Sequence, residues 1–196
     1  MGLLFTRWPA ATNLVTNGGF ETNTTGWEGT GGTIARYTSA AKFGVASGRV
    51  EVTVAADLAG ARQTTSIAAM TGTTFTASAW MRYTTVTANV QLIIVEYDVT
   101  DTFLRIGGTS GSVALTGAFA RSSVTVTLGA NTTQIRVWAV TFGSQTADFL
   151  VDGVQVETGA IATPYIETDG GTVTRSAGSV IASVGGGFIT PRAQYS

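Results

Sequence analysis

Short segments in which apolar and polar residues alternate recur along most of this chain, at intervals of about 10 to 15 residues. In Arg49–Ala55, for example, every second residue is a valine, so one face of a strand would be apolar and the other polar. Clusters of Gly, Asn, Asp and Thr separate the segments, and the 3.6-residue period of an amphipathic helix is nearly absent. We therefore expect strands joined by turns, with little helix.

Many short strands at this spacing predict an all-β protein, specifically an antiparallel β-sandwich of the jelly-roll type. The strand Ala88–Asp98 is so rich in Ile and Val that it is too apolar to have a fully wet face. The composition changes after Glu157, where glycine-rich sequence begins. We divide the chain into an N-terminal docking arm (1–12), a jelly roll (13–157) and a C-terminal arm or small β-element for assembly (158–196). The other segments predicted as strands are Thr73–Tyr83, Arg121–Leu128, Thr133–Phe142 and Asp148–Glu157.

The composition excludes several kinds of chemistry. The 196 residues include no cysteine and no histidine, so disulfides, thiol nucleophiles, zinc–thiolate sites and a Ser–His–Asp triad are impossible. The net charge is −1 and Lys42 is the single lysine, so we expect no nucleic-acid binding, which requires basic groups against phosphates. No apolar run approaches the length of about 18 residues needed to cross a bilayer, so no membrane insertion is expected.

Both ends of the chain carry apolar residues that a solvated terminus would not need. A floppy N-terminus is one interpretation, and an arm that docks on another subunit is the other. At the C-terminus a disordered tail, a small β-element and an arm that pairs with a neighbouring subunit all remain open. The candidate assembly residues are Leu3, Leu4, Phe5, Trp8, Phe188 and Ile189.

Three stretches resemble the jelly-roll carbohydrate-binding modules attached to many bacterial glycoside hydrolases. Asn13–Trp27 (NLVTNGGFETNTTGW) resembles their opening strand, Phe75–Arg82 (FTASAWMR) a central strand and Phe149–Val156 (FLVDGVQV) the closing strand. The three matches occur in the right order and span residues 13–157. The resemblance implies a jelly-roll fold and recognition of a sugar.

A fourth stretch changes the functional expectation. Gln155–Ala177 (QVETGAIATPYIETDGGTVTRSA) resembles a segment that follows such jelly rolls in bacteriophage tail and other virion proteins. This resemblance implies a non-enzymatic structural component of a phage particle, a capsid decoration or tail-associated protein on the particle surface. Its partners would be other virion proteins and itself, with a trimer favoured, and weak adhesion to a host glycan would be a second activity. The alternative is a secreted carbohydrate-binding module that recognises a polysaccharide.

The resemblance to carbohydrate-binding modules also implies a structural Ca²⁺, which often sits where the opening and closing strands meet. The matching carboxylates are Glu21 and Asp152. Calcium takes six to eight oxygen ligands, so two carboxylates and nearby carbonyls would suffice. The alternative interpretation is structural, with Glu21 capping a turn and Asp152 marking a bulge beside Gly153.

In that family, aromatic rings on the concave sheet stack against sugar rings. The strand alternation puts two tryptophans, each two residues from an arginine, on the more polar face of their strands, where they could share one surface. These candidate sugar-binding residues are Trp80, Arg82, Arg136 and Trp138. Packing in the core or in a subunit interface is the alternative for both tryptophans, and Trp27 is expected in the core.

Glu96, Asp98 and Asp101 are the remaining cluster with catalytic chemistry. Glu96 and Asp98 share a strand face, a spacing that could suit a carboxylate pair. Nothing else supports catalysis, and a solvated loop rim explains these residues. We expect no enzyme activity.

Overall fold

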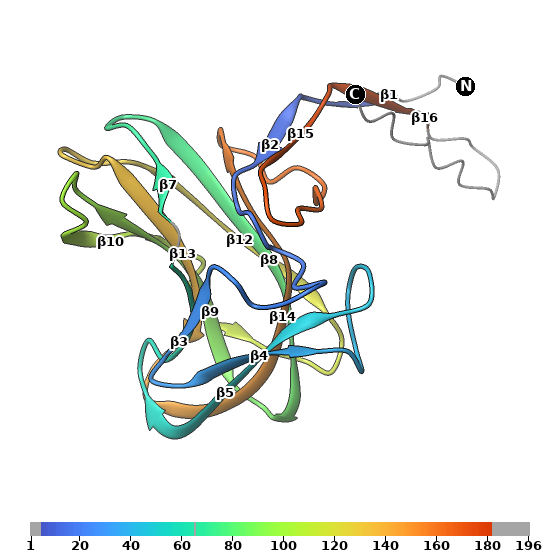
Figure 1. Ribbon diagram of the computed structural model, residues 1–196, viewed down its shortest axis with the longest axis vertical. Helices are drawn as coiled ribbons and strands as arrows, with labels where there is room; N and C mark the ends of the chain where they lie inside the picture. Colours follow the sequence, from blue (N-terminus) through green and yellow to red (C-terminus); the bar gives the residue numbers. More distant parts are fainter. Residues whose placement is uncertain (1–4, 65, 182–196) are drawn as a thin grey trace.

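The predicted antiparallel sandwich is confirmed in the computed structural model, which describes residues 5–64 and 66–181 (Figure 1). The first sheet has five strands in the order β12-β8-β14-β5-β4, and the second follows the path β10-β9-β13-β6-β3, with β11 paired to β9 and β7 to β13. The first sheet comprises β4 (Thr33–Tyr37), β5 (Ser47–Ala56), β8 (Thr74–Val86), β12 (Ala120–Thr127) and β14 (Gln145–Thr158). The second comprises β3 (Trp27–Thr30), β6 (Gly60–Gln63), β7 (Ile67–Ala68), β9 (Asn89–Tyr97), β10 (Phe103–Thr109), β11 (Val113–Ala114) and β13 (Gln134–Thr141). None of the described residues forms a helix, and hence none forms one able to span a membrane.

The core lies between the two sheets and follows the alternation in the sequence. On β8, every second residue from Phe75 to Met81 is buried and faces the core. The inner residues of the second sheet, among them Leu92 and Val137, pack in the same cluster. Trp27 is buried there as expected, and its indole N–H donates to the carbonyl of Asn17. The period-2 pattern therefore identifies the side of β8 that packs in this core.

The opening and closing segments that resemble carbohydrate-binding modules are tied together by one side chain. The buried Asn13 amide donates to the carbonyls of Val154 (3.1 Å) and Ile166 (2.9 Å). Its oxygen accepts from the N–H groups of Val15 and Val156. Asn13 thus satisfies four backbone groups from two ends of the domain, which explains why an asparagine begins this segment.

The chain that follows β14 returns across the outer face of the first sheet. The N–H of Thr163 donates to Glu157 Oε1 (2.7 Å), and the N–H of Ile166 donates to Gln155 Oε1 (2.8 Å). Arg121 donates to the carbonyl of Thr163 from β12. Glu157 and Gln155 are buried beneath this segment, so residues of the stretch that resembles virion proteins hold the chain on the sheet.

Beyond this segment, the two ends of the described chain pair with each other. β2 (Ala11–Asn13) pairs with β15 (Val173–Arg175), and β1 (Phe5–Trp8) pairs with β16 (Gly178–Ile181), both antiparallel. Figure 1 shows the β1–β16 pair leaving the sandwich as a two-stranded ribbon. Within the described residues the N-terminal and C-terminal segments therefore pair with each other, and contact with a neighbouring subunit stays a prediction. Of the candidate assembly residues, Leu3, Leu4, Phe188 and Ile189 lie outside the described residues.

Candidate functional site

The outer face of the second sheet carries an unusual set of side chains, which we call the aromatic face. Cross-strand register places Trp138 of β13 opposite Ile93 of β9 on one side and Arg62 of β6 on the other, with Glu28 of β3 beyond Arg62. Directly opposed residues in antiparallel strands share a face. By this rule the aromatic face includes Glu28, Arg62, Gln91, Ile93, Val95, Tyr97, Phe103, Ile106, Thr109, Gln134, Arg136, Trp138 and Val140.

The floor of the aromatic face is a second apolar cluster, separate from the main core. Ile93, Val95, Tyr97 and Val140 are buried in it, and Trp138 packs against them. This cluster explains why β9 is apolar at both parities, because its even positions face the core and its odd positions face this floor. The sequence-based expectation that the strand lacks a fully wet face is confirmed.

Two carboxylate–arginine–aromatic sets cover this floor. Arg62 donates from Nε to Glu28 Oε1 (2.6 Å), and its guanidinium carbon lies 5.6 Å from the ring centroid of Trp138. The second set is tighter. Arg136 Nη2 lies 2.7 Å from each carboxylate oxygen of Asp101, and the guanidinium carbon lies 4.6 Å from the Tyr97 ring centroid. Each arginine is therefore held between an aromatic ring and a carboxylate.

Polar groups and edge aromatics complete the aromatic face. Thr109 Oγ1 donates to Gln91 Oε1 (2.7 Å), and Phe103 meets Tyr97 edge-on at 6.3 Å between centroids. Phe103 is exposed and Trp138 is half-buried. The indole Nε1 of Trp138 is buried without a hydrogen-bond partner among the described residues. The face thus combines apolar ring surface with hydrogen-bonding groups at short range.

The structure separates the four predicted sugar-binding residues into two pairs. Trp138 and Arg136 lie on the aromatic face, whereas Trp80 and Arg82 lie on β8, in the first sheet. The alternation predicted correctly that each tryptophan lies on the side of its strand that faces away from the main core. It could not show that β8 and β13 belong to different sheets, so the expected shared surface does not form.

Trp80 and Arg82 occupy the outer face of the first sheet, which we call the covered face. It is formed by Ser78, Trp80, Arg82, Arg121, Asp148, Asp152, Gln155 and Glu157, with Arg49 and Glu51 at the side of β5. The Trp80 ring meets Phe43 edge-on at 6.0 Å, and Lys42 Nζ lies 4.1 Å from its centroid. Neighbouring loop residues therefore already pack against this ring.

The two predicted calcium ligands lie near each other. Asp152 is fully buried, which raises its pKa to about 6, and the charge of Glu21 contributes to that rise while backbone N–H groups oppose it. Asp152 accepts from the N–H groups of Lys42, Phe43 and Gly153. Glu21 Oε2 accepts from one further backbone N–H, whereas its Oε1 is buried with no partner.

This arrangement fits a hard cation in its chemistry, and the unpartnered Oε1 of Glu21 is the observation that supports one. The described residues contain no group of three acidic, His or Cys side chains, so backbone or water oxygens would have to complete the shell. Gly44 approaches so closely that a Cβ there would stand 2.2 Å from Glu21 Oε1, and its φ of +58° also favours glycine. Calcium at Glu21 and Asp152 stays a prediction.

The carboxylates considered for catalysis have structural contacts. Glu96 is completely buried, and its Oε2 accepts from the Gly129 N–H and the Thr132 hydroxyl while Arg105 pairs with Oε1. The solvated-rim interpretation is wrong for Glu96, because this carboxylate closes the loop after β12. Asp98 accepts from the Thr100 hydroxyl and from nearby backbone N–H groups, which lowers its pKa. These contacts shape the β9–β10 turn.

Sequence reasoning missed most of the aromatic face. Glu28 and Arg62 are 34 residues apart and Asp101 and Arg136 are 35 apart, so no local pattern links them. The one available signal was the strand that is apolar at both parities, since a second apolar face on β9 requires something to cover it. Tyr97, at the end of that strand, belongs to this second apolar face.

A family described as the concanavalin A-like lectin/glucanases superfamily matches residues 57–184, which is more than half of the chain. The chain belongs to this superfamily. The search of curated proteins found no match to this chain.

Solved structures similar to this superfamily member are mostly carbohydrate-binding modules. The CBM22-1 xylan-binding domain of Paenibacillus barcinonensis Xyn10C has a TM-score of 0.63 at 14% identity, over 79% of this chain and 99% of that one. The family 16 carbohydrate-binding module-2 has a TM-score of 0.55 at 20% identity, over 74% and 99%. The enzymatically active domain of bacteriophage CBA120 tailspike protein 4 has a TM-score of 0.59 at 15% identity, over 74% of this chain but 21% of that one. These likenesses show the shared jelly-roll fold.

Proposed function

We propose that this protein binds a carbohydrate chain on the aromatic face and does so without catalysis. The half-buried Trp138, seated on a floor of buried aliphatic residues, is the observation that carries the proposal. An indole ring offers the broad apolar surface on which the C–H face of a sugar ring packs. Arg62 beside it supplies hydrogen-bond donors for hydroxyls.

Several findings support this proposal over an assembly role alone. The similar solved structures include xylan-binding domains, and the superfamily is one of lectins and glucanases. The contacts of Glu96 and Asp98 are made with neighbouring loop residues, which favours binding over turnover. Trp80 is left outside the proposed site because it packs against Phe43 and lies in the first sheet, whereas the aromatic face belongs to the second.

Affinity electrophoresis in gels that contain single polysaccharides tests the proposal. The wild-type chain should be retarded by at least one polysaccharide, and Trp138→Ala should lose about tenfold or more of that affinity. Trp80→Ala is the matched control and should be retarded like the wild type. Both variants are checked for folding by their urea midpoints. Equal loss of affinity in both variants would overturn the proposal, and so would a wild-type chain that no polysaccharide retards.

A second candidate function is a structural role in a phage particle, exposed on the particle surface. The paired chain ends support it, because a ribbon that leaves the domain on one side is suited to join the domain to an assembly. The fold also occurs in the tailspike domain named above. The expected partners are other virion proteins and further copies of this chain, as a trimer. Removal of residues 1–10 and 172–196 should abolish incorporation into particles and leave glycan binding intact.

A further inference from the structure

We propose that Glu28 and Asp101 determine the charge specificity of the aromatic face, so that it accepts neutral glycans and rejects anionic ones. This inference rests on the proposed function. It assigns to two carboxylates a role in choosing the ligand, separate from the role of the aromatic rings in holding it.

The charges on the aromatic face balance. Arg62 and Glu28 form one ion pair, and Arg136 and Asp101 form the other, with the charged atoms no more than 2.7 Å apart. Glu28, Arg62 and Arg136 are the charged members of the face as defined above, and Asp101 joins them from the turn between β9 and β10 through its pair with Arg136. A ligand therefore meets a surface without net charge, rather than the basic surface that two arginines alone would create.

The carboxylates are also the outer members of their pairs. The side chains of Glu28 and Asp101 are 47% and 49% exposed, whereas those of Arg62 and Arg136 are 38% and 17% exposed. A uronate or sulfate group that approached the arginines would come within a few ångströms of a carboxylate and be repelled. A hydroxyl can accept from a guanidinium and donate to the neighbouring carboxylate, so a neutral sugar suits both partners. Exclusion by repulsion is a common means of specificity.

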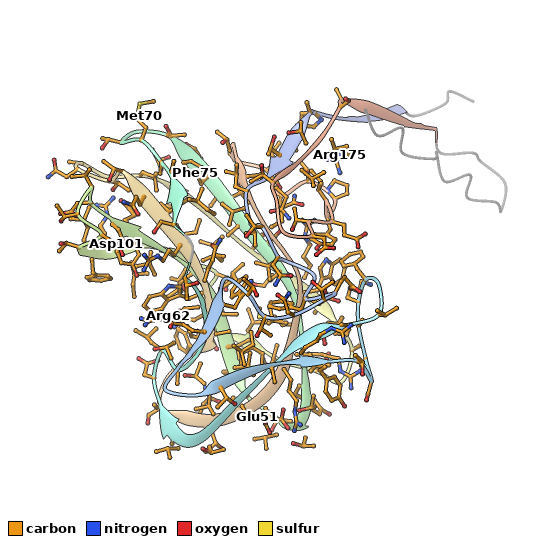
Figure 2. The ribbon with its side chains drawn as sticks, viewed as in Figure 1. Glu51, Arg62, Met70, Phe75, Asp101 and Arg175 are labelled. Atoms are coloured by element: carbon orange, nitrogen blue, oxygen red, sulfur yellow. The ribbon has the colours of Figure 1, made fainter. Side chains whose placement is uncertain are left out.

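Arg136 is held in place by contacts other than Asp101. Its Nε donates to Ser66 Oγ (3.0 Å), and its guanidinium stacks on Tyr97. Removing the charge of Asp101 should therefore leave the arginine on the face as an unbalanced cation. Figure 2 labels Arg62 and Asp101 on the left of the molecule and Glu51 at its lower end.

Glu51 provides a matched control. Its side chain is 41% exposed and pairs with Arg49 at 3.1 Å, so it resembles Glu28 in exposure and in having an arginine partner. Glu51 lies on β5, in the first sheet. Glu51→Gln changes the net charge of the protein by the same amount as Glu28→Gln without changing the aromatic face.

The test is affinity electrophoresis of the full chain in gels with neutral polysaccharides (β-glucan, galactomannan, arabinoxylan) or anionic ones (polygalacturonate, alginate). The wild type should be retarded in a neutral gel and not in an anionic one. The double variant Glu28→Gln/Asp101→Asn should gain about tenfold in retention by polygalacturonate at low salt, and salt above about 0.15 M should reduce that gain through screening. Glu28→Gln alone should also gain retention, whereas Glu51→Gln, which changes the net charge by the same amount as that single variant, should gain none.

The outcomes separate this inference from the proposed function. If neutral polysaccharides retard the wild type but the double variant gains no more than Glu51→Gln, the charge specificity is refuted and the binding function stands. If the wild type is retarded as strongly by polygalacturonate as by a neutral polysaccharide, the specificity is likewise refuted. If no polysaccharide retards the wild type, the proposed function fails and the inference fails with it.

Discussion

The two outer faces of the sandwich each bury some of their side chains, but by different means. On the covered face, the chain after β14 lies over the sheet, and buried side chains such as Gln155 and Glu157 bond its backbone. On the aromatic face, side chains of the sheet itself do the shielding, with arginines stacked over aromatic rings. One cover is a segment of backbone and the other is a layer of side chains.

The difference indicates where a ligand can bind. A ligand that displaced the segment on the covered face would leave several buried polar groups without partners, each at a cost of about 1–3 kcal/mol. A ligand on the aromatic face needs only to shift exposed ion pairs, which contribute about 0–1 kcal/mol each. The covered face therefore contributes stability, whereas side chains of the aromatic face can exchange their ion-pair contacts for contacts with a ligand.

The largest effect is expected from Glu157→Ala on the covered face. This change removes the acceptor of the Thr163 N–H and of the Gln155 amide, and it takes away the counter-charge of Arg121, whose pKa burial already lowers. The free energy of unfolding should fall by about 3 kcal/mol, measured by urea denaturation. Glu28→Ala on the aromatic face is the control and should cost less than about 1 kcal/mol. Equal losses would show that the two faces do not differ in this way.

The next effect concerns pH and Asp148. Hydrogen bonds from Arg49, Thr84 and Thr85 lower the pKa of the mostly buried Asp148 carboxyl to about 2. The folded state thus favours the ionised form, so this stabilisation is present at neutral pH and is lost as the pH falls from about 4 to about 2. The loss should amount to about 2 kcal/mol, since each pKa unit corresponds to about 1.4 kcal/mol.

Asp148→Asn should reduce stability at neutral pH by a similar amount and flatten the acid limb of the pH–stability curve, as measured by urea midpoints from pH 2 to 7. If Asp148→Asn loses stability toward low pH as steeply as the wild type, a group other than Asp148 causes the acid sensitivity.

A smaller effect, in binding rather than folding, is expected from Arg62→Ala. Loss of the guanidinium beside Trp138 should weaken glycan affinity about tenfold, or about 1.4 kcal/mol. The urea midpoint should hardly change because the Arg62–Glu28 pair is exposed. Arg82→Ala on the covered face is the control for binding. Loss of affinity in Arg82→Ala, with none in Arg62→Ala, would move the site to the other face.

The smallest effect is expected from calcium at the edge of the covered face. Millimolar Ca²⁺ should stabilise the fold by about 1 kcal/mol if it binds the folded state at Glu21 and Asp152. The melting temperature should then fall on addition of a chelator, and Glu21→Gln should abolish this response. An identical melting curve with and without chelator would exclude the metal.

Part of the aromatic face could be predicted from the sequence. The apolar character of β9 at both parities predicted that its outer side would be covered, and Trp138 was selected from its position on β13. The pairing of Trp138 with Trp80 failed because strand alternation reports the side of one strand and says nothing about its neighbours. The ion pairs could not be predicted from the sequence either. Glu28 pairs with Arg62, and Asp101 with Arg136, only because strands far apart in the chain lie side by side.

The amino-acid sequence by itself determined the all-β class, the core positions and the exclusion of thiol and imidazole chemistry, because alternation and composition act locally and need no partner. Only the tertiary structure decided which strands share a sheet, and so which side chains share a face. It also decided that the chain after β14 covers one outer face while arginines cover the other. Those outcomes depend on contacts between residues far apart in the chain, and such contacts follow from packing that no local pattern specifies.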